Sequence, residues 1–112
     1  MDITSHPLGQ ETVSGNSDPF QRQDMVLVGL FVNVTDVQGV LPTLLVRLQQ
    51  SPDGTNWYNV GNINVSGIAS VGLYSVAPAA LAMLADYIRV SWTITGTTPS
   101  FTFSADVVTH PT

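Results

Sequence analysis

The sequence has no cysteine and no lysine, and it has few charged residues of either sign. Without cysteine the chain can form no disulfide, no thiolate zinc site and no thiol nucleophile. Without lysine it cannot form a Schiff base. Its cations are Arg22, Arg47 and Arg89, against eight acidic residues. Because so few positive charges cannot neutralise many phosphates, we expect no general nucleic-acid binding.

Long hydrophobic runs are also missing. The longest one, residues 77–85, is much shorter than the roughly 20 residues that cross a bilayer. The first residues, MDITSHP, lack the basic and apolar regions of a secretion signal. We therefore expect a protein made in the cytoplasm that enters no membrane. Its 112 residues, of which 44% are hydrophobic, suffice for one domain with one core.

The chain divides into two parts. Residues 1–23 hold Pro and Gly among Ser, Thr, Gln and Asn without an apolar period, which indicates an extended or disordered N-terminal arm. Residues 24–112 contain short alternating or β-branched apolar stretches between turn residues. They predict an all-β domain, an antiparallel β-sandwich of jelly-roll or Ig-like type. The expected strands are residues 25–34, 43–50, 57–60, 63–65, 70–76, 87–95 and 101–107.

Several short segments are expected to connect these strands. Residues 39–43 (GVLPT) and 96–100 (GTTPS) share the pattern G-x-x-P-[S/T]. Each predicts a hairpin, because glycine allows positive φ and proline begins the next strand. Residues 51–57 (SPDGTNW) predict a turn similar to a shortened Asp box, with Trp57 packed beneath it. Residues 78–84 are too short for a stable helix and predict a helical turn or a buried loop.

Few residues suggest catalysis or metal binding. His6 and His110 lie near opposite ends of the sequence, each before a proline, and we expect both to be solvated. The serines include no G-x-S-x-G motif. The acids form no cluster, so turn and edge roles are favoured, and Asp36 with Asp53 is the best candidate for a calcium site. We expect no enzyme activity, no cofactor and no bound metal.

Candidate interface residues lie on two kinds of strand. Arg47 and Arg89 occupy the polar faces of alternating strands, where each could form an exposed ion pair, such as Arg89 with Asp106, or a protein contact. Residues 25–34 are apolar on both faces, so one face would meet the core and the other a neighbouring subunit. The candidates are Arg47, Arg89, Met25, Leu27 and Phe31.

A second kind of site would use aromatic rings. Sugars bind to exposed, coplanar rings, and Tyr58, Tyr74 and Tyr87 are the candidates for such stacking. Trp92 shares its strand parity with Ile88, which indicates a core position instead.

Residues 46–103 resemble small structural proteins of tailed bacteriophages. The resemblance rests on the turn SPDGxxW at residues 51–57, which follows a strand, and on YIRVSWTITGTTPSFTF at residues 87–103. It covers about half of the chain and leaves out the arm and residues 77–85. It implies a β-sandwich module of the virion, such as a head decoration protein, a head fibre or a tail component. It implies no catalytic residues.

From these features we expect a capsid decoration protein that binds the outer surface of the phage head and reinforces it. Its partner would be the major capsid protein of the same phage, and the chain would form a symmetric oligomer, expected to be a trimer. It would reside in the virion, with the N-terminal arm ordered on the capsid. The alternatives are a tail or tail-tip module, and a carbohydrate-binding module that contacts host glycans.

Overall fold

The computed structural model describes residues 2–21, 27–80 and 86–110, with the side chains of 6–19, 29–60, 63–76 and 86–108. Within these residues every regular element is a strand, and every strand pairing is antiparallel. The strands are β1 (Asp2–Glu11), β2 (Gly15–Asn16), β3 (Phe20–Gln21), β4 (Leu27–Ser51), β5 (Tyr58–Ile68), β6 (Gly72–Ala80) and β7 (Tyr87–His110).

Two long strands, β4 and β7, form the centre of the sheet. They pair over nearly their full length, from Leu27 opposite His110 to Ser51 opposite Tyr87. On the other edge of β4, β6 pairs with its first half and β5 with its second half. On the other edge of β7, β1, β2 and β3 follow one another. On each side of the middle of the β4–β7 ribbon the sheet is therefore up to four chain segments wide.

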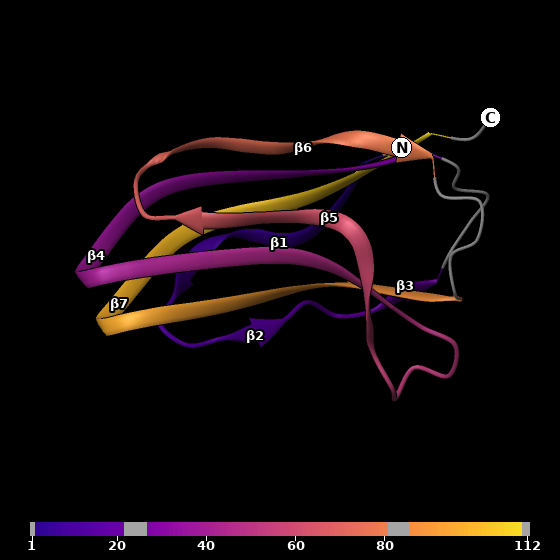
Figure 1. Ribbon diagram of the computed structural model, residues 1–112, viewed down its shortest axis with the longest axis horizontal. Helices are drawn as coiled ribbons and strands as arrows, with labels where there is room; N and C mark the ends of the chain where they lie inside the picture. Colours follow the sequence, from indigo (N-terminus) through magenta and orange to yellow (C-terminus); the bar gives the residue numbers. More distant parts are fainter. Residues whose placement is uncertain (1, 22–26, 81–85, 111–112) are drawn as a thin grey trace.

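This ribbon is folded back on itself near its middle. Figure 1 shows β4 and β7 bending together at the left of the view and returning. We call the part with β1, β6, residues 27–38 and residues 100–110 the first half, and the part with β2, β3, β5, residues 43–51 and residues 87–97 the second half.

Side chains from both halves meet in one hydrophobic core. In β4 and β7 alternate residues point into it, as the period of two in the sequence predicts. The predicted all-β, antiparallel fold is confirmed, and the packing of two halves on one core is consistent with the predicted β-sandwich. The members from β4 and β7 are Leu30, Val32, Val34, Leu44, Val46, Leu48, Ile88, Val90, Trp92, Phe101, Phe103, Ala105 and Val107.

The β4–β7 ribbon bends at the two copies of the G-x-x-P pattern. Gly39 and Gly96 have φ of 114° and 124°, and Leu41 and Thr98, two residues later, have φ of 49° and 45°. Each glycine lies against the opposite strand, since a Cβ would come within 2.8 Å of the Thr98 oxygen at Gly39 and within 2.9 Å of the Leu41 oxygen at Gly96. The expected pair of separate hairpins is therefore wrong. The two segments face each other and form one corner (residues 39–42 and 96–99), because β4 and β7 remain paired on both sides of it.

The N-terminal residues form an edge of the folded sheet. β1 pairs with the first half of β7, and β2 and β3 pair with its second half. Between them the Trp92 indole donates a hydrogen bond to the Val13 carbonyl oxygen at 3.2 Å, and Ser17 exchanges hydrogen bonds with the Val90 backbone. Residues 2–21 are thus extended, as one of our two alternatives has it, but they lie along the sheet of their own chain.

His6 joins this edge to the core. Only 6% of its surface is exposed, and its ring stacks on Phe103 with centroids 4.1 Å apart and meets the edge of Trp92 at 4.7 Å. Its Nδ1 lies 2.9 Å from the Phe103 carbonyl oxygen, and its Nε2 lies 3.6 Å from the Glu11 carboxylate. The expectation that His6 is solvated is wrong, because the pairing of β1 with β7 packs the ring against Phe103 and Trp92. The side chain of His110 lies outside the described part.

Several predicted elements merge or shift in the structure. Residues 58–60 and 63–65 belong to a single strand, β5, which begins one residue after the expected start at Trp57, and residues 87–95 and 101–107 both belong to β7. Of residues 78–84, the first three extend β6 and the rest lie outside the described residues. Among the described residues no helix has the length and hydrophobicity that a membrane span requires.

Alanine at the corner glycines tests the close approach of the two strands. We expect Gly39→Ala and Gly96→Ala each to lower the free energy of unfolding by about 2–4 kcal/mol, because positive φ and a backbone clash add up. Gly67 is the control, since its φ is 68° but no atom lies within 4 Å of an added Cβ. Gly67→Ala should cost only about 1 kcal/mol. Urea unfolding measures all three, and equal losses would contradict the close approach.

His6→Ala tests the attachment of β1. Removing a buried ring should lower the free energy of unfolding by about 3 kcal/mol. Leu8→Ala, at an exposed position of the same strand, is the matched control and should change it by less than about 0.5 kcal/mol. If both variants unfold at the urea concentration of the unsubstituted protein, β1 is not held by His6.

Candidate interaction surfaces

Arg47 and Arg89 lie on one outer face, that of the second half. In the register of β4 and β7, Arg47 is opposite Ser91 and Gln49 is opposite Arg89, so the two arginines are diagonal neighbours. Both side chains are half-buried. The polar parity that the sequence predicts for them is confirmed, and their role at an interface remains a prediction.

Arg89 is held by its own chain. Its Nε donates a hydrogen bond to Gln49 Oε1 at 2.9 Å, and its Cζ lies 4.2 Å from the centre of the Trp57 ring. Gln49 in turn donates a hydrogen bond to Asn59 Oδ1 at 3.1 Å, so this row of hydrogen-bonded side chains continues onto β5. Desolvation by partial burial lowers the pKa of the Arg89 guanidinium, which nevertheless stays charged at neutral pH.

The ion pair suggested for Arg89 is not formed. Asp106 lies opposite Phe31 in the first half of the sheet, whereas Arg89 lies in the second half. Trp57, expected beneath its own turn, has the Arg89 guanidinium over its ring. The ring that approaches the turn is that of Tyr87, within 3.8 Å of the position a Cβ would take at Gly54.

A depression of about 240 Å³ lies beside Arg47, between β4 and β5. β5 forms a bulge there, since Asn64 is opposite Arg47 while Asn59 is opposite Gln49, a step of five residues against two. Its lining is mixed, with Asn59, Asn64 and Ser66 beside Arg47. Within the described part of the chain no group forms a hydrogen bond or ion pair with the Arg47 guanidinium. The apolar lining residues are Leu45, Leu48, Val60 and Ile63.

The outer face of the first half carries Phe31. Phe31 is 41% exposed, and Leu73, on the neighbouring strand β6, is 84% exposed. A depression of about 200 Å³ lies beside them and includes Asp106, which is half-buried. Phe31 is therefore accessible for contact, on the face opposite to the arginines.

The five interface candidates do not form one described surface. Arg47 and Arg89 lie on the second half and Phe31 lies on the first. Met25 lies outside the described residues. The backbone of Leu27 begins β4, and its side chain lies outside the described part.

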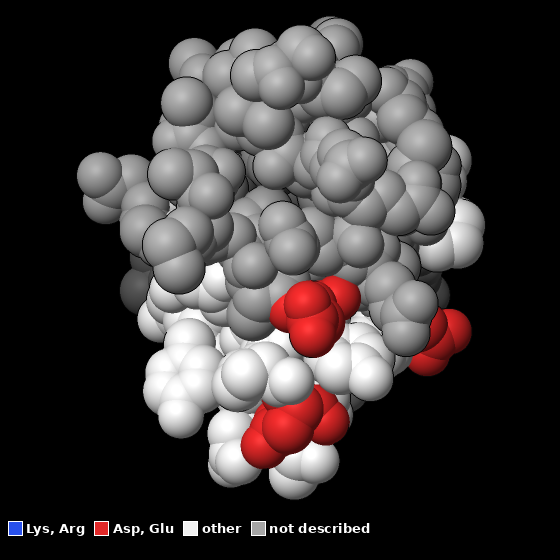
Figure 2. Space-filling model, turned by 90° about the vertical axis from the view of Figure 1, so that its right-hand side faces the viewer, with Lys and Arg blue, Asp and Glu red and all other residues white. Residues whose placement is uncertain are grey.

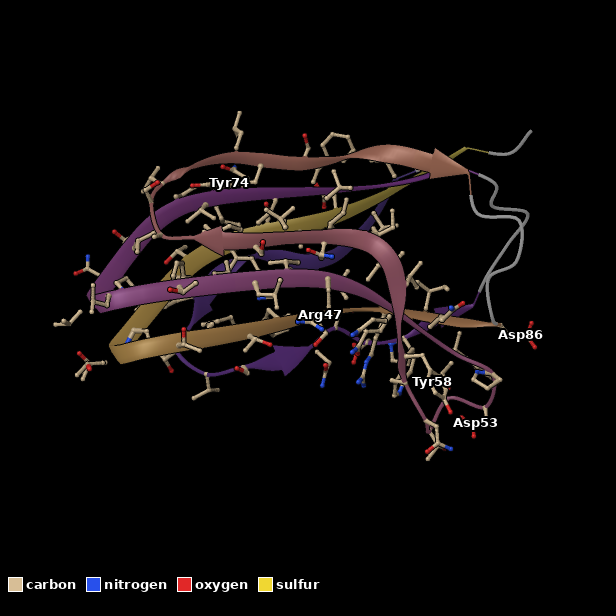
Figure 3. All side chains as sticks on the ribbon, in the orientation of Figure 1. Arg47, Asp53, Tyr58, Tyr74 and Asp86 are labelled. Atoms are coloured by element: carbon tan, nitrogen blue, oxygen red, sulfur yellow. The ribbon has the colours of Figure 1, made fainter. Side chains whose placement is uncertain are left out.

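The three tyrosines do not form a shared platform. Tyr58 is 60% exposed at the start of β5. Tyr74 packs against the core and donates a hydrogen bond to the Ser70 carbonyl oxygen at 2.8 Å. Figure 3 shows Tyr58 near the β4–β5 turn and Tyr74 on β6, far from it. Tyr87 is half-buried beside that turn.

Asp53, one calcium candidate, closes the β4–β5 turn. Its Oδ1 accepts hydrogen bonds from the backbone amides of Thr55 at 2.8 Å and Asn56 at 2.9 Å, and its Oδ2 accepts one from Asn56 Nδ2. Ser51 Oγ donates to Asp53 Oδ1 and accepts from the Gly54 amide. The Asn56 and Thr55 amides, followed by the side chains of Ser51 and Asn56, hold the pKa of the Asp53 carboxyl well below its usual range. The predicted turn is confirmed.

The second calcium candidate lies elsewhere. Asp36 is near the corner and accepts hydrogen bonds from Gln38 Nε2, whereas Asp53 is at the end of β4 distant from the corner. The structure therefore does not bring the two carboxylates together. The described residues include no group of three or more His, Asp or Glu side chains placed to hold a metal. Figure 2 shows the end with the turn, where acidic side chains stand among uncharged ones.

Comparison with known proteins finds no family model and no curated protein sequence that matches the chain.

The structure also shows exposed apolar residues that the sequence did not single out. Leu41 is 86% exposed, and the exposed residues Val40, Val13 and Val71 lie at the same end of the sheet, the last two in the bends at its two edges. We call these four residues the corner patch. Only Val40 and Leu41 carry a sequence signal, an apolar side chain inside the G-x-x-P pattern.

Asp53→Asn tests the charge of the turn. A carboxyl whose pKa is lowered by folding stabilises the protein above its unfolded pKa of about 3.9, and this contribution is lost as the pH falls further. We expect Asp53→Asn to be less stable than the unsubstituted protein from pH 5 to 7 and the difference to narrow below about pH 4. Urea unfolding across this pH range measures it.

Asp86→Asn is the control for the turn experiment, since Asp86 is exposed and forms no hydrogen bond within the described residues. Its free energy of unfolding should follow that of the unsubstituted protein at every pH. Equal stability of Asp53→Asn and the unsubstituted protein throughout would contradict a structural role for the carboxylate.

Proposed function

We propose that this chain is a structural virion protein of a tailed phage, and specifically a capsid decoration protein that binds the outer surface of the head and reinforces it. The resemblance to phage structural proteins supports this proposal. In the fold, the resembling residues supply the end of β4, all of β5, the first part of β6 and more than half of β7. The resembling segment therefore builds much of the central ribbon as well as one edge of the sheet.

The observation that carries the proposal is the corner patch. Val13, Val40, Leu41 and Val71 are large apolar side chains, each more than half exposed, on adjoining bends of the folded sheet. Val40 and Leu41 lie in β4 directly after Gly39. Exposed apolar groups gathered at one end of a molecule mark a surface that binds protein.

The scarcity of charge fits the same kind of contact. The cores of protein interfaces are depleted in charged residues, and residues 54–85, which include β5 and β6, contain none. We propose that the corner patch contacts the major capsid protein of the same phage and that the chain resides in the virion as a homo-oligomer, with a trimer as the expected state. A position in the tail is the alternative within the same class.

Binding to particles tests this function. We expect the purified chain to sediment with heads that lack it and Leu41→Asn to bind at least about 10-fold more weakly, because an apolar anchor is lost. Asparagine tolerates the positive φ of Leu41, so the fold should be retained. Thr98→Asn, at the equivalent corner position of β7, is the matched control and should bind as the unsubstituted chain does.

Two outcomes would overturn the proposal. The first is that the unsubstituted chain does not bind heads that lack it. The second is that the chain binds host glycans in a manner lost in Tyr58→Ala, which would favour a carbohydrate-binding module.

A further inference from the structure

Two half-buried opposite charges lack partners in the described part of the chain, and they lie on opposite outer faces. Arg47 is on the second half and Asp106 is on the first half. Figure 3 shows Arg47 in the middle of the molecule, away from Asp53 and Asp86 at the right-hand end. A charge that is partly removed from water gains from an opposite charge placed against it.

Arg47 is the cation available for such a contact. Among the described cations, Arg89 is already bound to Gln49 and stacked on Trp57. Arg47 has five N–H donors, and no described group of its own chain accepts from them. It borders the depression between β4 and β5, which is lined by both apolar and polar side chains.

Asp106 is the corresponding acid. Of the other acids with described side chains, Glu11 faces His6, Asp36 is bonded to Gln38 and Asp53 closes the turn. Asp18 and Asp86 are exposed, whereas Asp106 is half-buried. The acids with described side chains are Glu11, Asp18, Asp36, Asp53, Asp86 and Asp106.

An exposed apolar side chain borders the same depression as Asp106. Leu73, on β6, is 84% exposed, and β4 lies between it and Asp106 on β7. The depression beside Arg47 has a volume of about 240 Å³ and is lined by apolar side chains, among them Leu48 and Ile63, and by polar ones such as Asn64. One face therefore presents an exposed leucine and an acid at the rim of one depression, and the other presents a partly apolar hollow next to a base.

We propose that two copies of this chain bind each other through these faces. Leu73 of one copy enters the depression between β4 and β5 of the next, and Asp106 of the first copy pairs with Arg47 of the second. Because the two faces are different, the contact is heterologous, and repeating it gives a ring if the rotation closes and a filament if it does not. A symmetric contact between two first-half faces would instead bring two Asp106 carboxylates together.

This association rests on the proposed homo-oligomer and specifies the contact that forms it. Its failure can be distinguished from failure of the proposed virion function. The corner patch, not Leu73, Arg47 or Asp106, carries the proposed binding to the head. A variant can therefore lose self-association and still bind particles as a single copy.

Sedimentation velocity over a range of protein concentrations tests the contact. We expect the unsubstituted chain to self-associate, and Arg47→Asp and Asp106→Arg each to raise the dissociation constant at least about 10-fold. The double variant Arg47→Asp/Asp106→Arg restores the pair with exchanged charges and should return to within about 3-fold of the unsubstituted value. Higher salt should weaken the association.

A neutral substitution tests the apolar part of the contact. Leu73→Asn should also abolish the association, whereas Leu8→Asn, at another exposed leucine, should leave it unchanged. Circular dichroism on each variant shows whether it is folded. The proposal is overturned if the unsubstituted chain stays monomeric at all concentrations, or if the folded double variant associates no better than the single variants.

Discussion

The fold depends on the close approach of two backbones at one corner. Gly39 lies against residues 97–99 and Gly96 lies against residues 40–42, at distances that leave no room for a side chain at either glycine. The two contacts are equivalent, because in each one the glycine of one strand lies against the proline and the two preceding residues of the other strand. They allow the β4–β7 ribbon to fold without separating its strands, which places both halves of both strands around a single core.

The corner also decides what the molecule exposes. Folding the ribbon turns the apolar side chains of both halves inward. The hydrogen-bonded Arg89 and Gln49 therefore come to one outer face and Phe31 to the other. At the corner itself the strands turn too sharply for Leu41 to reach the core, and it remains exposed. The described surface thus carries exposed apolar side chains at the corner and a few well-spaced charges elsewhere.

The sequence predicts the features that depend on neighbouring residues. The period of two placed Ile88, Val90 and Trp92 in the core, and the Ser51–Gly54 pattern identified the turn. It could not show that residues 39–43 and 96–100 face each other, because pairing between segments 57 residues apart leaves no local signal. For the same reason His6 was expected in solvent, although its own strand pairs with residues nearly 100 positions later and so places the ring in the core.

Electron cryomicroscopy of the phage particles tests the central claim, which is that this folded ribbon is a module of the virion surface. The account predicts density for the chain on the outside of the head, with the corner patch against the major capsid protein. Density for the chain only in the tail would contradict the decoration role. Its absence from the particle altogether would contradict the virion function.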